Sequence, residues 1–300
     1  VALAAPEGLD ALDTGDTQVA ALIARLKRVL DQGVPLLVQG ASGTGKASLV
    51  RALHQQSARR SMPLVQVHCA PAGAATLDAS GLLKKLQQAQ GGTLWLADVG
   101  DLPPPLQALL LRVLQAEQFT APGDQSSQVP VTLDVAWVCS TRRPLSAPGF
   151  DASLLHHLSG LAVTLPALCE RTDLPALVQR LLPACGATAA ARVSGAAQAL
   201  LAAQAWPGNL RQLRSVLRTA LLLAGPAGEV LPEHLPDEFL QAARSDTAGP
   251  AAAQAAGSLQ DQELAAVRAA VQAAGGNISV AARALGVSRN TVYRKLRQDA

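Results

Sequence analysis

The chain has 300 residues, 49% hydrophobic and 16% charged, which suits one large α/β domain with one or two small helical domains. Its net charge of +3 is too small to identify a partner when averaged over the chain. No apolar run is long enough to cross a membrane and no signal-peptide pattern is present, so we expect a cytoplasmic protein without membrane contact. The cysteines are scattered and no histidines cluster, which argues against zinc or disulfides and predicts reduced core thiols.

Two segments precede the first motif. Residues 1–16 show no hydrophobic periodicity, so we expect an irregular arm there. Residues 17–31 carry apolar side chains at helical spacing, which predicts an amphipathic helix built on Val19, Leu22, Ile23, Leu26, Val29 and Leu30.

Residues 34–50 (VPLLVQGASGTGKASLV) run from an apolar strand through a glycine-rich loop into a helical pattern. Gly40, Gly45 and Lys46 fit G-x-x-x-x-G-K, the P-loop pattern. The amides of such a loop converge on phosphate oxygens and the next helix directs its positive end there, so we expect a nucleoside triphosphate. The predicted nucleotide contacts in this loop are Gly40, Ser42, Gly43, Thr44, Gly45, Lys46 and Ala47.

Ala47 stands where a P-loop usually carries the Ser or Thr that binds the metal. A methyl group offers no oxygen, although Ser48 is next along the chain. This replacement counts against Mg²⁺, so we predict no metal site.

The remaining strands of the sheet domain are expected at residues 63–69, 93–99, 131–140 and 161–165. These segments are almost continuously apolar and alternate with helical patterns, which predicts a parallel sheet with both faces covered. After the third strand, Asp101 is the predicted cap of a helix that carries Leu106, Leu110 and Val113 on one stripe, with Pro103 in its first turn.

Beyond Glu170 the pattern changes to helices alone, clearest at residues 174–182, 194–205 and 209–223. Residues 244–258 then lack large apolar side chains, which indicates a linker. We therefore predict an α/β nucleotide-binding domain at 1–170, a small helical lid domain at 171–243, a linker at 244–258 and a separate unit at 259–300.

The unit at 259–300 has the pattern of a helix-turn-helix. Gly275 and Gly276 end one helix, Asn277 begins a second, and a Gly286-Val287 turn leads to a third helix capped by Ser288. We expect double-stranded DNA as the partner, with Arg283, Ser288, Arg289, Asn290, Thr291, Arg294 and Lys295 at the interface. The alternative is an ordinary solvated helical hairpin.

Four motifs in order resemble the bacterial enhancer-binding proteins, the sigma-54-dependent activators with AAA+ and Fis-type domains. They are GGTLWLADVGDLP at 91–103, LPALCERTD at 165–173, WPGNLRQL at 206–213 and GNISVAARALGVSRNTVYRKL at 276–296. The resemblance implies a hexamer-forming ATPase that contacts sigma-54 RNA polymerase, a dimeric DNA-binding end, and Arg211 at the nucleotide. It also fits a sensory domain before the Val at position 1.

Several residues depart from that family's pattern on the hydrolysis reaction. The acidic pair Asp-Glu is replaced by Ala97-Asp98, so the metal-side carboxylate is absent and Asp98 remains as a shortened base. Arg142 replaces the Asn of the sensor position, and Asp151 and His157 replace two arginines expected at a neighbour's phosphate. An arginine finger is worth about a thousandfold or more in phosphoryl transfer, so we expect impaired hydrolysis.

The family's GAFTGA loop, its contact to sigma-54, is missing between Ala70 and Gly91. We expect residues 77–86 to form a helix that bridges two strands, although a surface around 76–85 that contacts the polymerase is an alternative. The sequence therefore predicts a DNA-binding regulator with ATP binding retained and sigma-54 activation lost. The rivals are a working ATPase that uses Asp98 and Arg211, and a dimerising scaffold without nucleotide.

Overall fold

A computed structural model describes residues 8–70, 77–119, 131–145, 149–188, 191–225 and 228–239, together with Ala282. The chain divides into two units, Val1–Phe239 and Leu240–Ala300. The sheet and the lid both belong to the first unit. The predicted helix-turn-helix, with all seven of its DNA-contact residues, lies outside the described residues and stays a prediction.

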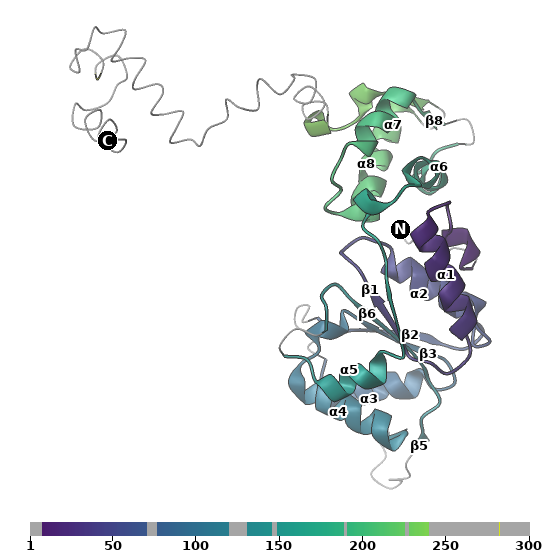
Figure 1. Ribbon diagram of the computed structural model, residues 1–300, viewed down its shortest axis with the longest axis vertical. Helices are drawn as coiled ribbons and strands as arrows, with labels where there is room; N and C mark the ends of the chain where they lie inside the picture. The colour runs from purple at the N-terminus through teal and green to yellow at the C-terminus, as the bar shows by residue number, and fades with distance from the viewer. Residues whose placement is uncertain are drawn as a thin grey trace. The chain divides into compact units, whose positions relative to one another are not determined.

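A five-stranded parallel sheet forms the centre of the first unit, in the order β2-β3-β6-β1-β7 (Figure 1). This confirms the parallel sheet expected from the continuous apolar segments. Its strands are β1 (Leu36–Gln39), β2 (Leu64–His68), β3 (Thr93–Ala97), β6 (Ala136–Thr141) and β7 (Leu161–Thr164). The P-loop strand β1 lies between β6 and β7, so the loop after it opens at the same edge as the ends of β3 and β6.

Helices cover both faces of the sheet (Figure 1). One face packs on α1 (Thr17–Val29) and α2 (Lys46–Gln56), and the other on α3 (Ala79–Gln88), α4 (Pro104–Ala116) and α5 (Ala152–Leu158). Successive strand residues alternate between the two cores: Leu37 belongs to the α3–α5 core, whereas Leu36 and Val38 belong to the α1–α2 core. The predicted helices at 17–31 and 77–86 are confirmed.

Two local predictions are wrong. Residues 131–140 are not one strand, because β5 (Val131–Thr132) pairs antiparallel with β4 (Gln118–Phe119), apart from β6. Asp101 does not cap α4: it ends the 3-10 turn Val99–Asp101, and its carboxylate accepts from two arginines. Pro103 occupies the cap position of α4 without a side-chain bond, and Pro104 at the first helical position needs no N–H acceptor.

The lid consists of α6 (Leu174–Ala184), α7 (Gly195–Ala202) and α8 (Asn209–Ala224) around Trp206, whose indole N–H donates to Leu201 O at 2.8 Å. Trp206 also packs edge-on against Phe239, with ring centroids 5.5 Å apart. The prediction of helices alone missed a small parallel pair, β8 (Arg192–Val193) with β9 (Glu229–Val230). Short 3-10 turns complete the described elements, at Asp10–Leu12, Leu168–Glu170 and Pro232–His234.

All four cysteines are free, as predicted, but they are not all core thiols. Burial raises the pKa of the Cys69 thiol to about 12 and also raises the pKa of Cys139, which leaves both thiols protonated at neutral pH. Cys185 is half-buried. Cys169 is exposed, because it lies in the connection from the sheet to the lid rather than on a strand.

The described part of the N-terminal segment, residues 8–16, is not the irregular arm that we predicted, because it ties the start of α1 to the start of the lid. Leu9 is fully buried in the α1–α2 core. One oxygen of Asp16 caps α1 through Gln18 N and Val19 N, both at 3.0 Å. The other oxygen accepts from Thr172 N at 3.0 Å and Thr172 Oγ1 at 3.1 Å. Asp16 therefore both caps the first helix and holds Thr172, at the start of the lid, in place.

Arg171 and Asp173 form a buried ion pair beside this cap, with side chains only 6% and 3% exposed. The guanidinium also donates to Thr14 Oγ1 at 3.1 Å, and the Thr14 hydroxyl in turn donates to Asp173. Burial acts to raise the pKa of the Asp173 carboxyl, but the hydrogen bonds from Arg171 and Thr14 together hold that pKa below its usual value. The ionised carboxylate therefore contributes to stability.

We expect Asp173→Asn to lower the free energy of unfolding by about 3–5 kcal/mol at pH 7, because it leaves the buried Arg171 charge without its partner. Since the folded-state pKa is lowered, the carboxylate contribution is present above an unfolded-state value of about 4 and is lost as the pH falls through the folded-state value. The difference in the free energy of unfolding between variant and wild type should therefore become smaller as the pH falls through that folded-state value. Urea denaturation from pH 3 to pH 8 measures both.

The control is Asp10→Asn, which breaks a surface pair between Asp10 and Lys27, 74% and 36% exposed. That change should stay within about 0.5 kcal/mol of wild type. Equal stability of Asp173→Asn and Asp10→Asn at pH 7 would contradict the role of the buried pair.

Candidate nucleotide-binding site

The P-loop, residues 40–46, connects β1 directly to α2, which begins at Lys46. Gly43 and Gly45 have φ angles of 82° and 101°, a region that L side chains rarely adopt. Gly45 is the cap residue of α2 and leaves the first amides of the helix free of side-chain partners. Backbone donors at the positive end of an 11-residue helix thus face the loop, as phosphate binding requires.

The loop holds its lysine by carbonyl oxygens. Lys46 Nζ donates to Gly40 O at 2.6 Å and Ala41 O at 2.8 Å. Thr44 is buried, and its hydroxyl donates to Ala41 O at 3.0 Å, so this side chain shapes the loop interior. Burial lowers the pKa of the Lys46 ammonium, opposed by the charge of Asp98.

The lid packs directly on this loop. Gly208 O lies 2.1 Å from the place where a Cβ on Gly43 would be, so only glycine fits at position 43. Asn209 Nδ2 donates to Ser42 O at 2.9 Å, and Asn209 Oδ1 accepts from Leu168 N at 2.7 Å. The structure also brings the predicted Arg211 to the loop, where its Nη1 lies 3.3 Å from Ser42 Oγ.

Sequence reasoning treated Asn209 only as the start of a helix and missed this contact. The side chain is 3% exposed and its backbone has a φ of 51°. The available signal was the Gly-Asn pair after Trp-Pro, because Asn tolerates a left-handed backbone better than most residues. The identity of its partner, 167 residues away, was not visible in the sequence.

The two positions at which the metal ligands are missing carry methyl groups in one apolar core. Ala97 is 6% exposed and belongs to the α1–α2 core, and Ala47 packs against that core. The part of the chain that the structure describes contains no group of three or more His, Cys, Asp and Glu side chains suited to a metal ion. At positions 47 and 97 the side chains therefore offer Mg²⁺ no oxygen ligand.

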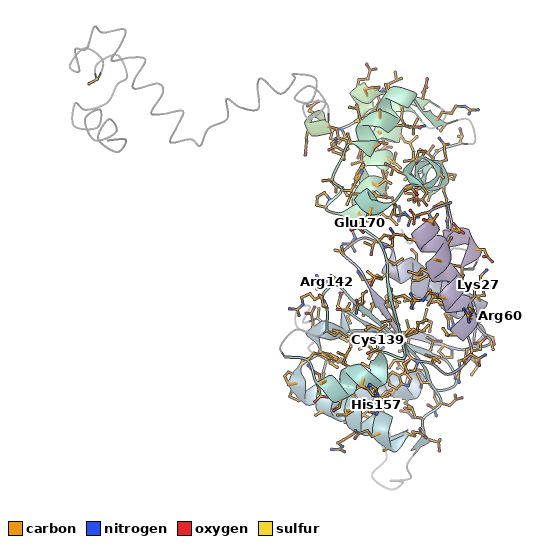
Figure 2. The ribbon with its side chains drawn as sticks, in the orientation of Figure 1. Lys27, Arg60, Cys139, Arg142, His157 and Glu170 are labelled. Atoms are coloured by element: carbon orange, nitrogen blue, oxygen red, sulfur yellow. The ribbon has the colours of Figure 1, made fainter. Side chains whose placement is uncertain are left out.

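Asp98, the predicted weak base, follows β3 in a left-handed backbone with φ of 55°. Its carboxylate accepts from Arg142 Nε at 3.0 Å. Arg142 Nη2 donates to Asp101 Oδ2, also at 3.0 Å, so one guanidinium joins two carboxylates (Arg142 is labelled in Figure 2). Sequence reasoning named Arg142 only as a lost sensor and missed its partner Asp101. This contact engages one of the two carboxylate oxygens of Asp98.

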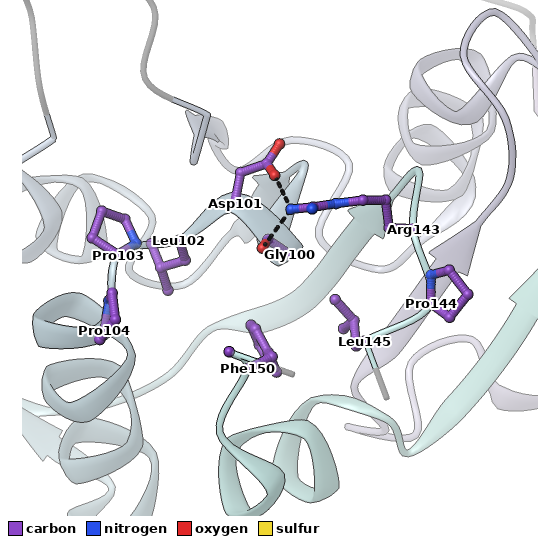
Figure 3. Close-up of a pocket in the computed structure, with 10 residues that line it drawn as sticks. Gly100, Asp101, Leu102, Pro103, Pro104, Arg143, Pro144, Leu145 and Phe150 are labelled. Carbon is purple, nitrogen blue, oxygen red and sulfur yellow. Dashed lines mark hydrogen bonds and ion pairs between the residues drawn. The ribbon is translucent and has the colours of Figure 1, made fainter. Parts of the chain in front are cut away.

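A cavity of about 370 Å³ lies on the far side of this cluster, where Arg143 pairs with Asp101 and donates to Gly100 O at 3.3 Å (Figure 3). Its walls come from the start of α4 and from residues 143–145 and 149–150. None of the predicted nucleotide contacts lines it. The cavity is therefore separate from the candidate nucleotide site at the P-loop.

Asp151 and His157, the replacements for two arginines, have local roles in α5. Asp151 caps that helix through Leu154 N at 2.8 Å. His157 Nδ1 lies 2.8 Å from Ser153 O one turn earlier, and the residue lies well apart from Arg142 in Figure 2. Neither side chain can supply the permanent positive charge of a guanidinium.

Comparison with known families matches the chain in three parts. Residues 12–83 and 72–161 match the Sigma-54 interaction domain, residues 170–252 the AAA+ ATPase lid domain, and residues 258–298 the Fis family of bacterial regulatory proteins. The Sigma-54 interaction domain is matched in two separate ranges, which overlap at residues 72–83, inside the interval that lacks GAFTGA.

Individual proteins are similar to this chain over nearly its whole length. The chain is 37% identical to the acetoin catabolism regulatory protein of Cupriavidus necator, with 98% of the chain covering 48% of that protein. It is 32% identical to the alginate biosynthesis regulator AlgB of Pseudomonas aeruginosa, with coverage of 96% and 67%. The structure of NtrX from Brucella abortus in complex with ATP is similar at a TM-score of 0.64 and 29% identity, over 97% of this chain and 71% of that one. The chain thus spans about half the length of the first relative.

We expect Gly43→Ala to destabilise the protein more than an alanine at another left-handed glycine. Both changes strain the backbone, by about 1–3 kcal/mol, but only at position 43 does the new Cβ meet the Gly208 carbonyl. The matched control is Gly33→Ala, because Gly33 has a φ of 69° with nothing within 4 Å of the added Cβ. Urea denaturation compares the two. An equal loss of stability would show that the lid contact contributes nothing.

Proposed function

The chain belongs to the family of bacterial sigma-54-dependent regulators with an AAA+ domain, a lid and Fis-type helices, and on that basis we propose that it is a sequence-specific DNA-binding transcription regulator. Its AAA+ domain binds ATP, hydrolyses it poorly, and does not activate sigma-54 polymerase. The observation that carries the poor hydrolysis is the pair of methyl groups at Ala47 and Ala97.

The features of the loop support ATP binding. Lys46, the amides at the start of α2, and Arg211 from the lid meet around residues 40–46. Hydrolysis needs more than this grip: a placed metal, an oriented water and a charge from a neighbouring subunit. The two alanines remove side-chain oxygens that would place the metal. Asp98, which would orient the water, is paired with Arg142. Asp151 and His157 do not supply the charge of an arginine finger.

Loss of sigma-54 activation has independent support. The sequence between Ala70 and Gly91 holds no GAFTGA, and its described part is the helix α3, capped by Asp78 through Gly81 N at 2.7 Å. The division of the family match at residues 72–83 falls in the same interval. The rival roles, a working ATPase and a nucleotide-free scaffold, are separated by phosphate release and by nucleotide titration.

For ATP, we expect calorimetric binding to the wild type and a loss of about tenfold or more in affinity for Lys46→Ala. Steady-state phosphate release should be about a thousandfold or more below that of a relative with intact acidic and arginine positions. Lys27→Ala, on the surface of α1, is the control and should bind like the wild type. Turnover at the relative's rate, or binding indifferent to Lys46, would refute this part of the proposal.

For DNA, we expect Arg289→Ala to cost about 1–3 kcal/mol on the preferred site and to relax the sequence preference. Lys295→Ala should instead weaken binding to all sequences similarly and reduce the salt dependence, because we assign it to phosphate. Fluorescence anisotropy with specific and scrambled duplexes at two salt concentrations distinguishes these effects. Wild-type affinity and selectivity in Arg289→Ala would overturn the assigned base contact.

For transcription, we expect no ATP-dependent open complex when the protein is added to sigma-54 polymerase on a promoter that carries its binding site. Ala97→Asp should not restore activity, because the contact loop would still be missing. A relative with GAFTGA is the positive control in the same reconstituted assay. Open-complex formation by the wild-type chain would refute this part of the proposal and favour a polymerase contact around residues 76–85.

A further inference from the structure

Arg142 lies at the edge of the sheet next to the P-loop. It directly follows β6, the strand between β1 and β3. Gly40 N, at the start of the P-loop, donates to Thr141 O at 3.2 Å, and Thr141 is the residue before Arg142. Ala97, the vacant metal-side position, pairs in register with Ser140 on the same strand. The Arg142 guanidinium is therefore attached to the end of β6, the strand that contacts both the start of the P-loop and Ala97.

The contacts of Arg142 are those of a cation between carboxylates. Separate nitrogens of the one guanidinium meet Asp98 and Asp101, each at 3.0 Å. Its side chain is still 48% exposed, so it remains accessible to a ligand. A guanidinium keeps its charge at every physiological pH and can pair with two partners at once, which suits a permanent counter-charge for carboxylate or phosphate.

The charges around the lysine are predominantly positive. Lys46 interacts electrostatically with Arg142, Arg211 and Asp98. Asp101 adds a second carboxylate on Arg142, so three cations stand against two carboxylates. A triphosphate without metal carries more negative charge than its Mg²⁺ complex and is best held by several fixed cations. In a P-loop with metal ligands, much of that charge is balanced by Mg²⁺ instead.

We propose that this site binds the nucleoside triphosphate as the metal-free anion, with the Arg142 guanidinium in place of the positive charge that Mg²⁺ supplies elsewhere. The inference rests on the ATP binding proposed above. It follows from two observations together: methyl groups close the metal side at positions 47 and 97, and a paired but accessible arginine stands at the adjoining strand end.

The test is calorimetric titration of the full chain with ATP in excess EDTA and in excess Mg²⁺. We expect the two dissociation constants to agree within about threefold, whereas a site that uses the metal should lose about tenfold or more in EDTA. Binding only with Mg²⁺ would overturn this inference and leave the proposed ATP binding intact. Absence of binding in both buffers would overturn both.

Arg142→Ala should weaken the EDTA-buffer affinity by about tenfold or more, because it removes a charge-assisted contact. Arg143→Ala is the matched control: it is the next residue, also pairs with Asp101, is 68% exposed, and should bind like the wild type. Arg142→Lys keeps the charge and should retain part of the affinity, which separates charge from folding; circular dichroism monitors the fold of each variant. Unchanged binding in Arg142→Ala, or equal losses in Arg142→Ala and Arg143→Ala, would overturn the assignment.

Discussion

The approach of the Gly208 carbonyl to Gly43 is the constraint on which the nucleotide site depends. It leaves no room for a side chain at position 43 of the P-loop and places the next residues of the lid, Asn209 and Arg211, against Ser42. Because Asn209 also accepts from Leu168 N, the connection from the sheet, the P-loop and the lid meet at one buried amide. A second set of bonds, from Asp16 and Thr14 to residues 171–173, ties the lid to α1. The conformation of the P-loop therefore depends on both the sheet and the lid, and a ligand bound at the loop would affect both.

The residues that replace the hydrolytic machinery are integrated into the fold. Ala47 and Ala97 add methyl groups to an existing core instead of leaving buried oxygens without a metal. Asp151 caps a helix, and Arg142 pairs with the carboxylates of Asp98 and Asp101, which both follow β3. Among the buried side-chain nitrogens and oxygens of the described residues, none lacks a hydrogen-bond partner. The replaced positions thus leave no buried polar side chain unsatisfied among the described residues.

Nucleotide binding without turnover has a different use from an ATPase cycle. A ligand that binds only the folded, closed arrangement stabilises it by mass action, in proportion to its concentration over its dissociation constant. With contacts from both the loop and the lid, ATP would favour the arrangement in which they touch. Under the proposed function, nucleotide would set the conformation presented to partner subunits and DNA, and the regulator would respond to occupancy instead of to hydrolysis.

The sequence by itself determined the parallel sheet, the P-loop and the lid helices, because apolar periodicity and glycine spacing are local properties that a short window contains. The replaced positions came from the resemblance to a family. The tertiary structure alone decided how distant segments meet. Asp101 looked like a helix cap because it stands before a proline and a leucine stripe, but β6 returns beside it and brings two guanidinium groups that bind a carboxylate more strongly than free amides do. Residues 131–140 looked like one strand, yet the first two residues pair antiparallel with β4, the short strand after α4. Leu9, Thr14 and Asn209 carry no periodic signal, and their roles arise from partners 47 to 167 residues away, whose proximity exists only once the sheet has formed.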